Sequence, residues 1–297
     1  MEHKLTGDNM QKIVAIGDLH GHYEQLMQIF DKFMDNDWYG VDPNKDVFVF
    51  MGDYIDGGPD SKGILMELIS LKEQFPHWKF LFGNHESLFL DGISKTKPIY
   101  GDYYLWYNQG GKATLESFKP AQSLVGLDEY ERMQRAVMQP KDLITEEYTS
   151  FLRNLDLFYE TDDFFFVHGG LYPNRSIKDH KKAVKKDYPV AFHPDLMREG
   201  DMAYDMIWMR EPFIGSDYDW GKKIIFGHTT WPYGSFRGTD QKTQKLSSQP
   251  GCPFVMDNQI GIDTMMHNVG RITAVILPEG KFIQSEFTSD ETWQLPP

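Results

Sequence analysis

The sequence contains almost no cysteine, few basic residues for its size and no long apolar run. Cys252 is the single cysteine among 297 residues, so no disulfide framework is available and a reducing cytoplasm is the expected location. The 30 Lys and Arg residues are outnumbered by 44 Asp and Glu residues, which gives a net charge of −14 at pH 7. Such a surface repels phosphate backbones, so general nucleic-acid binding is not expected. The best apolar runs, such as residues 47–51, are too short to span a bilayer, and no membrane association is expected.

The composition is that of an ordinary globular protein. The chain is 40% hydrophobic and 25% charged, and it is long enough to bury a large core. We find no internal repeat, low-complexity tract or linker, and therefore expect one domain over residues 1–297. Within it we expect a helical insertion at about residues 112–155, a surface excursion at about residues 172–200 and a loose tail at about residues 286–297.

Several short apolar runs are followed directly by a pair of residues, one of them a glycine and the other a residue whose side chain can bind a metal. The runs cover residues 13–16, 47–51, 79–82, 164–167 and 224–226, and they end in Gly17-Asp18, Gly52-Asp53, Gly83-Asn84, His168-Gly169 and Gly227-His228. Helical periodicity follows the first two runs. This order predicts an α/β fold that delivers polar side chains to the carboxyl ends of its strands. One Gly-Asp pair alone is as well explained by a turn. From residue 255 onward, short apolar stretches predict further strands that close the fold.

The polar residues at these predicted strand ends form a candidate metal site. They are Asp18, His20, Asp53, Asn84, His168 and His228. Oxygen and nitrogen donors without thiolate suit Mn, Fe or Zn. Six ligands exceed what one catalytic ion takes, whereas two ions that share a carboxylate would use them all. A lone histidine is more often a hydrogen-bonded structural residue, and we assign His3, His22, His77, His180, His193 and His267 to that class.

The motifs resemble those of a known family. They are Gly17-Asp18-Leu19-His20-Gly21, Gly52-Asp53-Tyr54-Ile55-Asp56-Gly57-Gly58, Gly83-Asn84-His85-Glu86, His168-Gly169-Gly170 and Gly227-His228-Thr229. In this order they resemble the PPP-type metallophosphatases of the calcineurin-like superfamily, which include serine/threonine phosphatases and symmetrical dinucleoside tetraphosphatase-like enzymes. The resemblance spans residues 13 to about 263. It implies a calcineurin-like β-sandwich flanked by helices.

The resemblance also implies roles for individual residues. Asp18 and His20 would hold a first metal ion, Asp53 would bridge both ions, and Asn84, His168 and His228 would hold the second. Two ions are implied, with Mn²⁺ expected and Fe or Zn as alternatives. His85 would be the general acid and Asp56 would orient it. The alternative for Asp56 is a turn carboxylate that caps the two glycines after it.

The chain departs from the family pattern at Gly57, where the family has an arginine that clamps phosphate oxygens. Loss of such a donor weakens transition-state binding unless another cation substitutes. Arg210 and Lys112 are the candidates, because their surroundings resemble phosphate-contacting segments of bacterial members. The alternatives are a surface ion pair for Arg210 and an ordinary helical cation for Lys112. Arginine restored at position 57 is expected to raise kcat/KM unless one of these two residues already fills the pocket.

Three functions are compatible with the sequence. The first is a metal-dependent phosphohydrolase that acts on phosphomonoesters, including phosphorylated proteins, by direct attack of activated water. The second is a pyrophosphohydrolase that cuts dinucleoside polyphosphates or related anhydrides with the same metals. The third, motivated by Gly57, is a phosphate-binding protein that has lost turnover.

Overall fold

Two five-stranded β-sheets form the centre of the computed structural model, which describes residues 11–94, 105–118, 144–184, 201–230, 251–266 and 269–287. The first sheet has the order β12 (Lys281–Gln284), β11 (Thr273–Leu277), β1 (Ile13–Ile16), β2 (Val47–Phe50) and β3 (Lys79–Phe80). The second has the order β4 (Phe158–Glu160), β5 (Phe164–Val167), β6 (Lys223–Phe226), β8 (Gln259–Gly261) and β7 (Phe254–Val255). A short ribbon pairs β9 (Met265–Met266) with β10 (Val269–Gly270).

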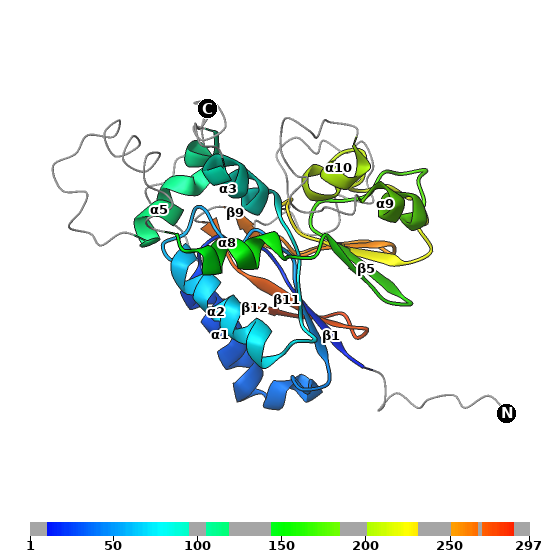
Figure 1. Cartoon of the computed structure of the whole chain (residues 1–297). Coiled ribbons are helices and arrows are strands. Elements are labelled where there is room, and N and C mark those ends of the chain that lie inside the picture. Colours follow the sequence, from blue (N-terminus) through cyan, green and yellow to red (C-terminus); the bar gives the residue numbers. More distant parts are fainter. Residues whose placement is uncertain are drawn as a thin grey trace.

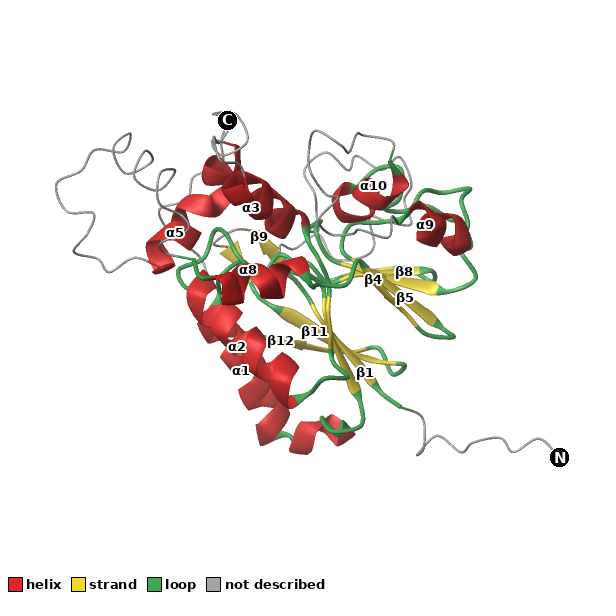
Figure 2. Cartoon of the chain, in the orientation of Figure 1, coloured by secondary structure: helices red, strands yellow, loops and turns green. Residues whose placement is uncertain are grey.

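Helices lie on the outer sides of the two sheets (Figures 1 and 2). Beside the first sheet are α1 (Tyr23–Asp35) and α2 (Ser61–Gln74), with α3 (Asn84–Ser94), α5 (Lys112–Phe118) and α8 (Glu146–Arg153) at one end. Beside the second sheet are α9 (Ile177–Ala183) and α10 (Met202–Trp208). Two tight turns, η2 (Asp37–Gly40) and η3 (Tyr107–Gly111), complete the described elements. The expected sandwich flanked by helices is confirmed.

The strands divide the core into layers because successive side chains point to opposite faces of a sheet. In β1, Ile13 and Ala15 pack between the two sheets together with Phe166 and Ile225 of the second sheet. Val14 and Ile16 of the same strand point to the opposite face, where they pack with residues of the helices in the larger cluster. Both faces of the central strands are therefore buried, which explains why they are continuous apolar runs in the sequence.

Three parallel strands in each sheet end at the same edge of the sandwich. In the first sheet β1, β2 and β3 are parallel, and in the second β5, β6 and β8 are parallel. Within four residues of the end of each of these six strands, the chain carries one of the polar side chains of the site described below. This edge collects residues that lie more than 200 positions apart in the sequence.

The structure describes the first part of the expected surface excursion at residues 172–200. Residues 172–184 contain helix α9, which begins with a capping box in which Ser176 Oγ accepts from the backbone N of Asp179 at 3.2 Å. That box satisfies two backbone donors and starts a helix where the sequence showed little periodicity. Residues 185–200, most of the expected insertion between residues 119 and 143, and the tail from residue 288 lie outside the described residues.

Among the described residues, no helix is long and apolar enough to cross a membrane.

Candidate active site

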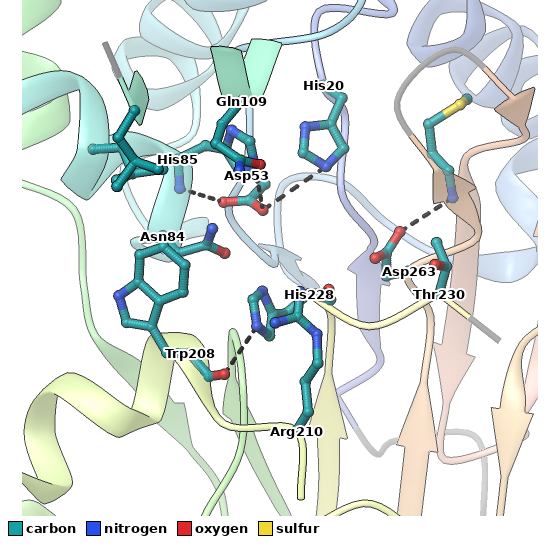
Figure 3. A pocket seen from close by; sticks show the side chains of 13 residues that line it. His20, Asp53, Asn84, His85, Gln109, Trp208, Arg210, His228, Thr230 and Asp263 are labelled. Carbon is teal, nitrogen blue, oxygen red and sulfur yellow. Dashed lines mark hydrogen bonds and ion pairs between the residues drawn. The ribbon is translucent and has the colours of Figure 1, made fainter. Parts of the chain in front are cut away.

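A cavity of about 430 Å³ opens at the edge where the parallel strands end. Six of the residues singled out from the sequence line it, namely His20, Asp53, Asn84, His85, Arg210 and His228 (Figure 3). Asp18, Asp56 and His168 are buried beside it, with exposures of 1%, 0% and 0%. The structure therefore brings together all six predicted metal ligands and the predicted acid.

Asp53 lies at the centre of this cluster. Its Oδ2 is 3.3 Å from His168 Nε2, 3.8 Å from His20 Nε2 and 4.0 Å from His85 Nε2. Its Oδ1 accepts a hydrogen bond from the backbone N of His85 at 2.9 Å. Asp53, His20 and His228 all have left-handed backbones, with φ of 50°, 42° and 63°. Such conformations are costly for residues other than glycine and concentrate at functional sites.

The three predicted imidazole ligands are oriented by backbone carbonyls. His20 Nδ1 is 3.2 Å from the Ile55 carbonyl oxygen and His168 Nδ1 is 2.8 Å from that of Met51. With Nδ1–H donated to the carbonyl, Nε2 is the nitrogen left for a cation. His228 has the opposite arrangement, because its Nε2 is 3.0 Å from the Trp208 carbonyl oxygen. This pattern of one nitrogen anchored and one presented is typical of metal-ligating histidines.

Two groups of side chains have the spacing needed to hold a cation. One consists of Asp53, His168 and His228, and the other of Asp53, His20 and His85. The first contains the residues implied for the second metal, and Asn84 Oδ1 joins it at 2.9 Å from His168 Nε2. A proton on His168 Nε2 satisfies the Asn84 and Asp53 oxygens, and a divalent cation bound to the same atoms would do so too. The donor set therefore fits a metal.

Asp18 offers a further oxygen. Its Oδ2 accepts from the backbone N of His228 at 2.9 Å, whereas its buried Oδ1 has no hydrogen-bond partner. A buried carboxylate oxygen without a partner is costly unless a cation satisfies it. Gly227 makes room for it, because a Cβ there would lie 2.2 Å from Asp18 Oδ1. Asp18 is absent from both three-residue groups above, so its role as a ligand stays a prediction.

The charges of the site favour protons when no cation is bound. Burial, followed by the Asp263 and Asp53 carboxylates, raises the pKa of Asp18 well above its ordinary value. Burial and Asp53 likewise raise the pKa of Glu86 to about 7. Burial also opposes the charge on Asp53, but His168 and His85 outweigh it and hold the Asp53 pKa well below its usual range. Crowded buried carboxylates of this kind are stabilised by bound cations.

His85 is paired with the carboxylate that the resemblance implied. Its Nδ1 donates to Asp56 Oδ2 at 2.9 Å, and both side chains are buried. Burial opposes the positive charge of His85, but Asp53 and Asp56 outweigh it and raise the His85 pKa to about 9. His85 thus holds a proton close to the cavity. The role of general acid stays a prediction.

The substrate-binding candidates lie in different places. Arg210 lines the cavity, and its Nη2 is 3.5 Å from the His228 carbonyl oxygen. Lys112 begins α5, is half-buried and is not among the described residues that line the cavity. The loop that precedes it places Gln109 there instead, after which Gly110 turns the chain with φ of 108°. An arginine at position 57 would have a strained backbone, because Gly57 has φ of 93°. The expectation that it raises kcat/KM stays a prediction.

Asp263, Trp208 and Gln109 also line the cavity, and none of them is among the site residues predicted from the sequence. Asp263 follows β8 by two residues, so the pattern of a polar side chain after a buried strand applies to it as well. Burial and then Asp53 raise the pKa of Asp263 to about 7, although its Oδ1 accepts from the Met265 backbone N at 3.1 Å. Trp208 and Gln109 do not follow a strand, but they stand in the segments around Arg210 and Lys112 that resemble bacterial members of the family.

A model of the calcineurin-like phosphoesterase family matches residues 11–256. The chain belongs to this family. The metal-dependent chemistry of the family agrees with the two groups of His and Asp side chains that could hold an ion.

The individual relatives are similar to this chain at low identity or over only part of their length. The chain is 25% identical over 180 residues to a zinc-dependent endopolyphosphatase of Saccharomyces cerevisiae, covering 59% of this chain and 51% of that protein. It is 38% identical over 76 residues to a PP2A-like serine/threonine-protein phosphatase of Candida albicans, covering 25% of this chain and 17% of that protein. The chain thus spans about half the length of the first relative and under a fifth of the second.

Solved structures show the same architecture at low identity. A cold-active protein-tyrosine phosphatase of a Shewanella species is 17% identical, with a TM-score of 0.50, and the match covers 94% of this chain and 81% of that one. This likeness shows the fold alone.

Proposed function

We propose that this protein is a metal-dependent phosphohydrolase that acts on phosphomonoesters, including phosphoserine and phosphothreonine in proteins. The observation that carries the proposal is the buried His85–Asp56 pair, with its 2.9 Å hydrogen bond, directly beside the Asp53 cluster. An alkoxide is a poor leaving group and needs a proton as the ester bond breaks. A phosphate or nucleotide leaving group needs much less help. A well-built acid therefore favours alkyl phosphate esters.

Two cations would be held by the proposed ligands. Asp18 and His20 would hold one, Asn84, His168 and His228 would hold the other, and Asp53 would serve both. When bound, such cations lower the pKa of water and polarise phosphoryl oxygens. Mn²⁺ is our first choice, with Fe and Zn as alternatives, because all three accept mixed oxygen and nitrogen donors.

The remaining roles belong to side chains that reach the cavity. Arg210 binds a phosphoryl oxygen of the substrate through its guanidinium. His85 Nε2 donates its proton to the leaving oxygen, while Asp56 stabilises the imidazolium and keeps Nδ1 protonated. Lys112 is a weaker candidate for phosphate contact, since it starts α5 behind the turn that carries Gln109.

Hydrolysis of phosphoanhydrides is the second candidate. Its support is the similarity to a protein named as an endopolyphosphatase. Against it, Arg210 is the one Lys or Arg among the described residues that line the cavity, whereas dinucleoside polyphosphates and polyphosphate carry several charges. A phosphate-binding protein without turnover is the third candidate, and the intact ligand set and acid oppose it.

One domain over residues 1–297 and a cytoplasmic location stay predictions.

A substrate panel tests the proposal. Purified protein with Mn²⁺, Zn²⁺ or Fe²⁺ is assayed on p-nitrophenyl phosphate, a phosphoserine peptide, a dinucleoside tetraphosphate and polyphosphate, with metal content measured in parallel. We expect both monoesters to be hydrolysed. Activity confined to the anhydrides would move the assignment to the second candidate, and bound metal without any turnover would move it to the third.

A His85→Asn variant then tests the mechanism. It should retain metal and lose activity on the phosphoserine peptide by about 100-fold or more, the range typical of general acid catalysis. The loss on p-nitrophenyl phosphate should be much smaller, because p-nitrophenolate leaves without protonation. Equal losses on both esters would contradict the role of His85.

A further inference from the structure

The Asp56 carboxylate is held by two side chains from the segment at residues 105–118, which contains none of the predicted metal ligands. Its Oδ2 accepts from Trp106 Nε1 at 2.9 Å, in addition to the bond from His85 Nδ1. Its Oδ1 accepts from Thr114 Oγ1 at 2.6 Å. Asp56, Trp106 and Thr114 have exposures of 0%, 0% and 1%, so water does not compete for these bonds.

The direction of each hydrogen bond follows from the donors present. An indole N–H can only donate, and the Thr114 hydroxyl donates its single proton to Asp56 Oδ1. Thr114 Oγ1 then accepts from the Asp56 backbone N at 2.9 Å and from Ser61 Oγ at 3.0 Å. Asp56 accepts from both Trp106 and Thr114, and as an ionised carboxylate it also accepts from His85, which then carries a proton on Nδ1.

Trp106 and Thr114 come from a different part of the chain, the segment at residues 105–118. This segment is docked on the Asp56 turn through its backbone as well, because the N of Gly57 donates to the carbonyl oxygen of Gly110 at 3.2 Å. A Cβ on Gly110 would lie 2.7 Å from that nitrogen, so the contact requires glycine at position 110. The position of the segment and the geometry of the Asp56 turn are thus coupled.

We propose that Trp106 and Thr114 are positioning residues for the general acid. They hold the Asp56 carboxylate in the orientation that keeps a proton on His85 Nδ1 and points Nε2 into the cavity. The kinetic part of this inference rests on the proposed function, whereas the protonation of Nδ1 can be observed without turnover.

Thr114→Val removes the hydroxyl with little change in shape, and Trp106→Phe removes the indole N–H together with part of the buried ring system. Each should lower kcat on the phosphoserine peptide by about 10- to 100-fold, as is typical for residues that orient a functional group. On p-nitrophenyl phosphate each should stay within about threefold of the wild type, because that ester needs no acid. Thr114→Ser keeps the hydroxyl and should restore activity. Thr149→Val is the matched control, since Thr149 is buried and hydrogen-bonded within α8, to the Glu146 carbonyl oxygen at 3.2 Å.

A double-mutant cycle separates positioning from general damage. In a His85→Asn background, Thr114→Val should cause no further loss on the peptide, because the residue it positions is gone. Equal losses on both esters, or the full loss again in the His85→Asn background, would overturn the proposal. Unchanged peptide activity in both single variants would overturn it as well.

Nuclear magnetic resonance provides the readout that is independent of activity. In protein labelled with ¹⁵N-histidine, the His85 Nδ1 proton should exchange slowly with water in the wild type and in Thr114→Ser. Its signal should broaden or disappear in Thr114→Val and Trp106→Phe. If the wild type hydrolyses no ester, the proposed function is wrong, and the Nδ1 proton signal alone then tests the positioning role. An unchanged signal in both variants would then overturn the positioning role.

Discussion

Gly227→Ala is expected to damage the candidate metal site while leaving the fold intact. A Cβ at this position would lie 2.2 Å from Asp18 Oδ1 and 3.2 Å from Asp18 Cγ. Carbon–oxygen contacts are normally about 3.3 Å or longer, so the carboxylate must move by about 1 Å. The oxygen that must move is the buried one without a hydrogen-bond partner. The substitution therefore tests whether that oxygen binds a cation.

The expected magnitudes differ sharply between stability and function. Asp18 can adjust at its side-chain end, so the free energy of unfolding should fall by no more than about 2 kcal/mol. Metal ligands tolerate displacements of only about 0.2 Å, and a misplacement of 1 Å in an active site costs about 100-fold in rate. We therefore expect one strongly bound Mn²⁺ in place of two, and a kcat/KM lowered by about 100-fold.

Gly63→Ala is the matched control. There a Cβ would also lie 2.2 Å from a carboxylate oxygen, Oδ2 of Asp60, which caps the start of α2. This variant should show the same metal content and kcat/KM as the wild type. Metal content is measured after dialysis, affinity by calorimetric titration and stability by thermal unfolding. Gly227→Ala protein with two Mn²⁺ bound at wild-type affinity and with normal kcat/KM would refute the reasoning.

Three further predictions concern charge and backbone conformation. Asp53→Asn should abolish hydrolysis and lower metal content, because it removes the carboxylate that both candidate groups share; unchanged metal analysis would contradict the bridging role. Gly57→Arg should lower the free energy of unfolding by about 1–2 kcal/mol, since φ of 93° is strained for any side chain; a raised kcat/KM with an unchanged Tm would contradict this. Burial disfavours charge on His85, but Asp53 and Asp56 raise its pKa to about 9. Its stabilisation of the metal-free protein is complete below pH 6.5 and is lost as the pH rises through 9, by about 3 kcal/mol. The Tm in the presence of chelator should therefore fall between pH 7 and pH 10, and a rise would show that the sign is wrong.

Much of the fold followed from local pattern. The runs at residues 13–16 and 164–167 are the strands β1 and β5 with the expected bounds, because strands buried on both faces are continuous apolar segments. Helix α9 was not expected, since its seven residues are too few to show periodicity. The run at residues 79–82 was predicted as one strand, but β3 ends at Phe80 and Leu81 pairs instead with Asp156. Pairing partners of that kind are not visible in a single segment.

The amino-acid sequence by itself determined that the predicted metal ligands and His85 collect at the site, because each of them follows a buried strand in a motif of fixed spacing. Tertiary structure alone decided how these side chains are held in place. The hydrogen bonds from Trp106 and Thr114 to Asp56 join residues 50 and 58 positions apart, and the room for Asp18 depends on Gly227, more than 200 positions away. Sequence patterns record the local order of residues, whereas such contacts arise only when separate strands, turns and helices pack against one another.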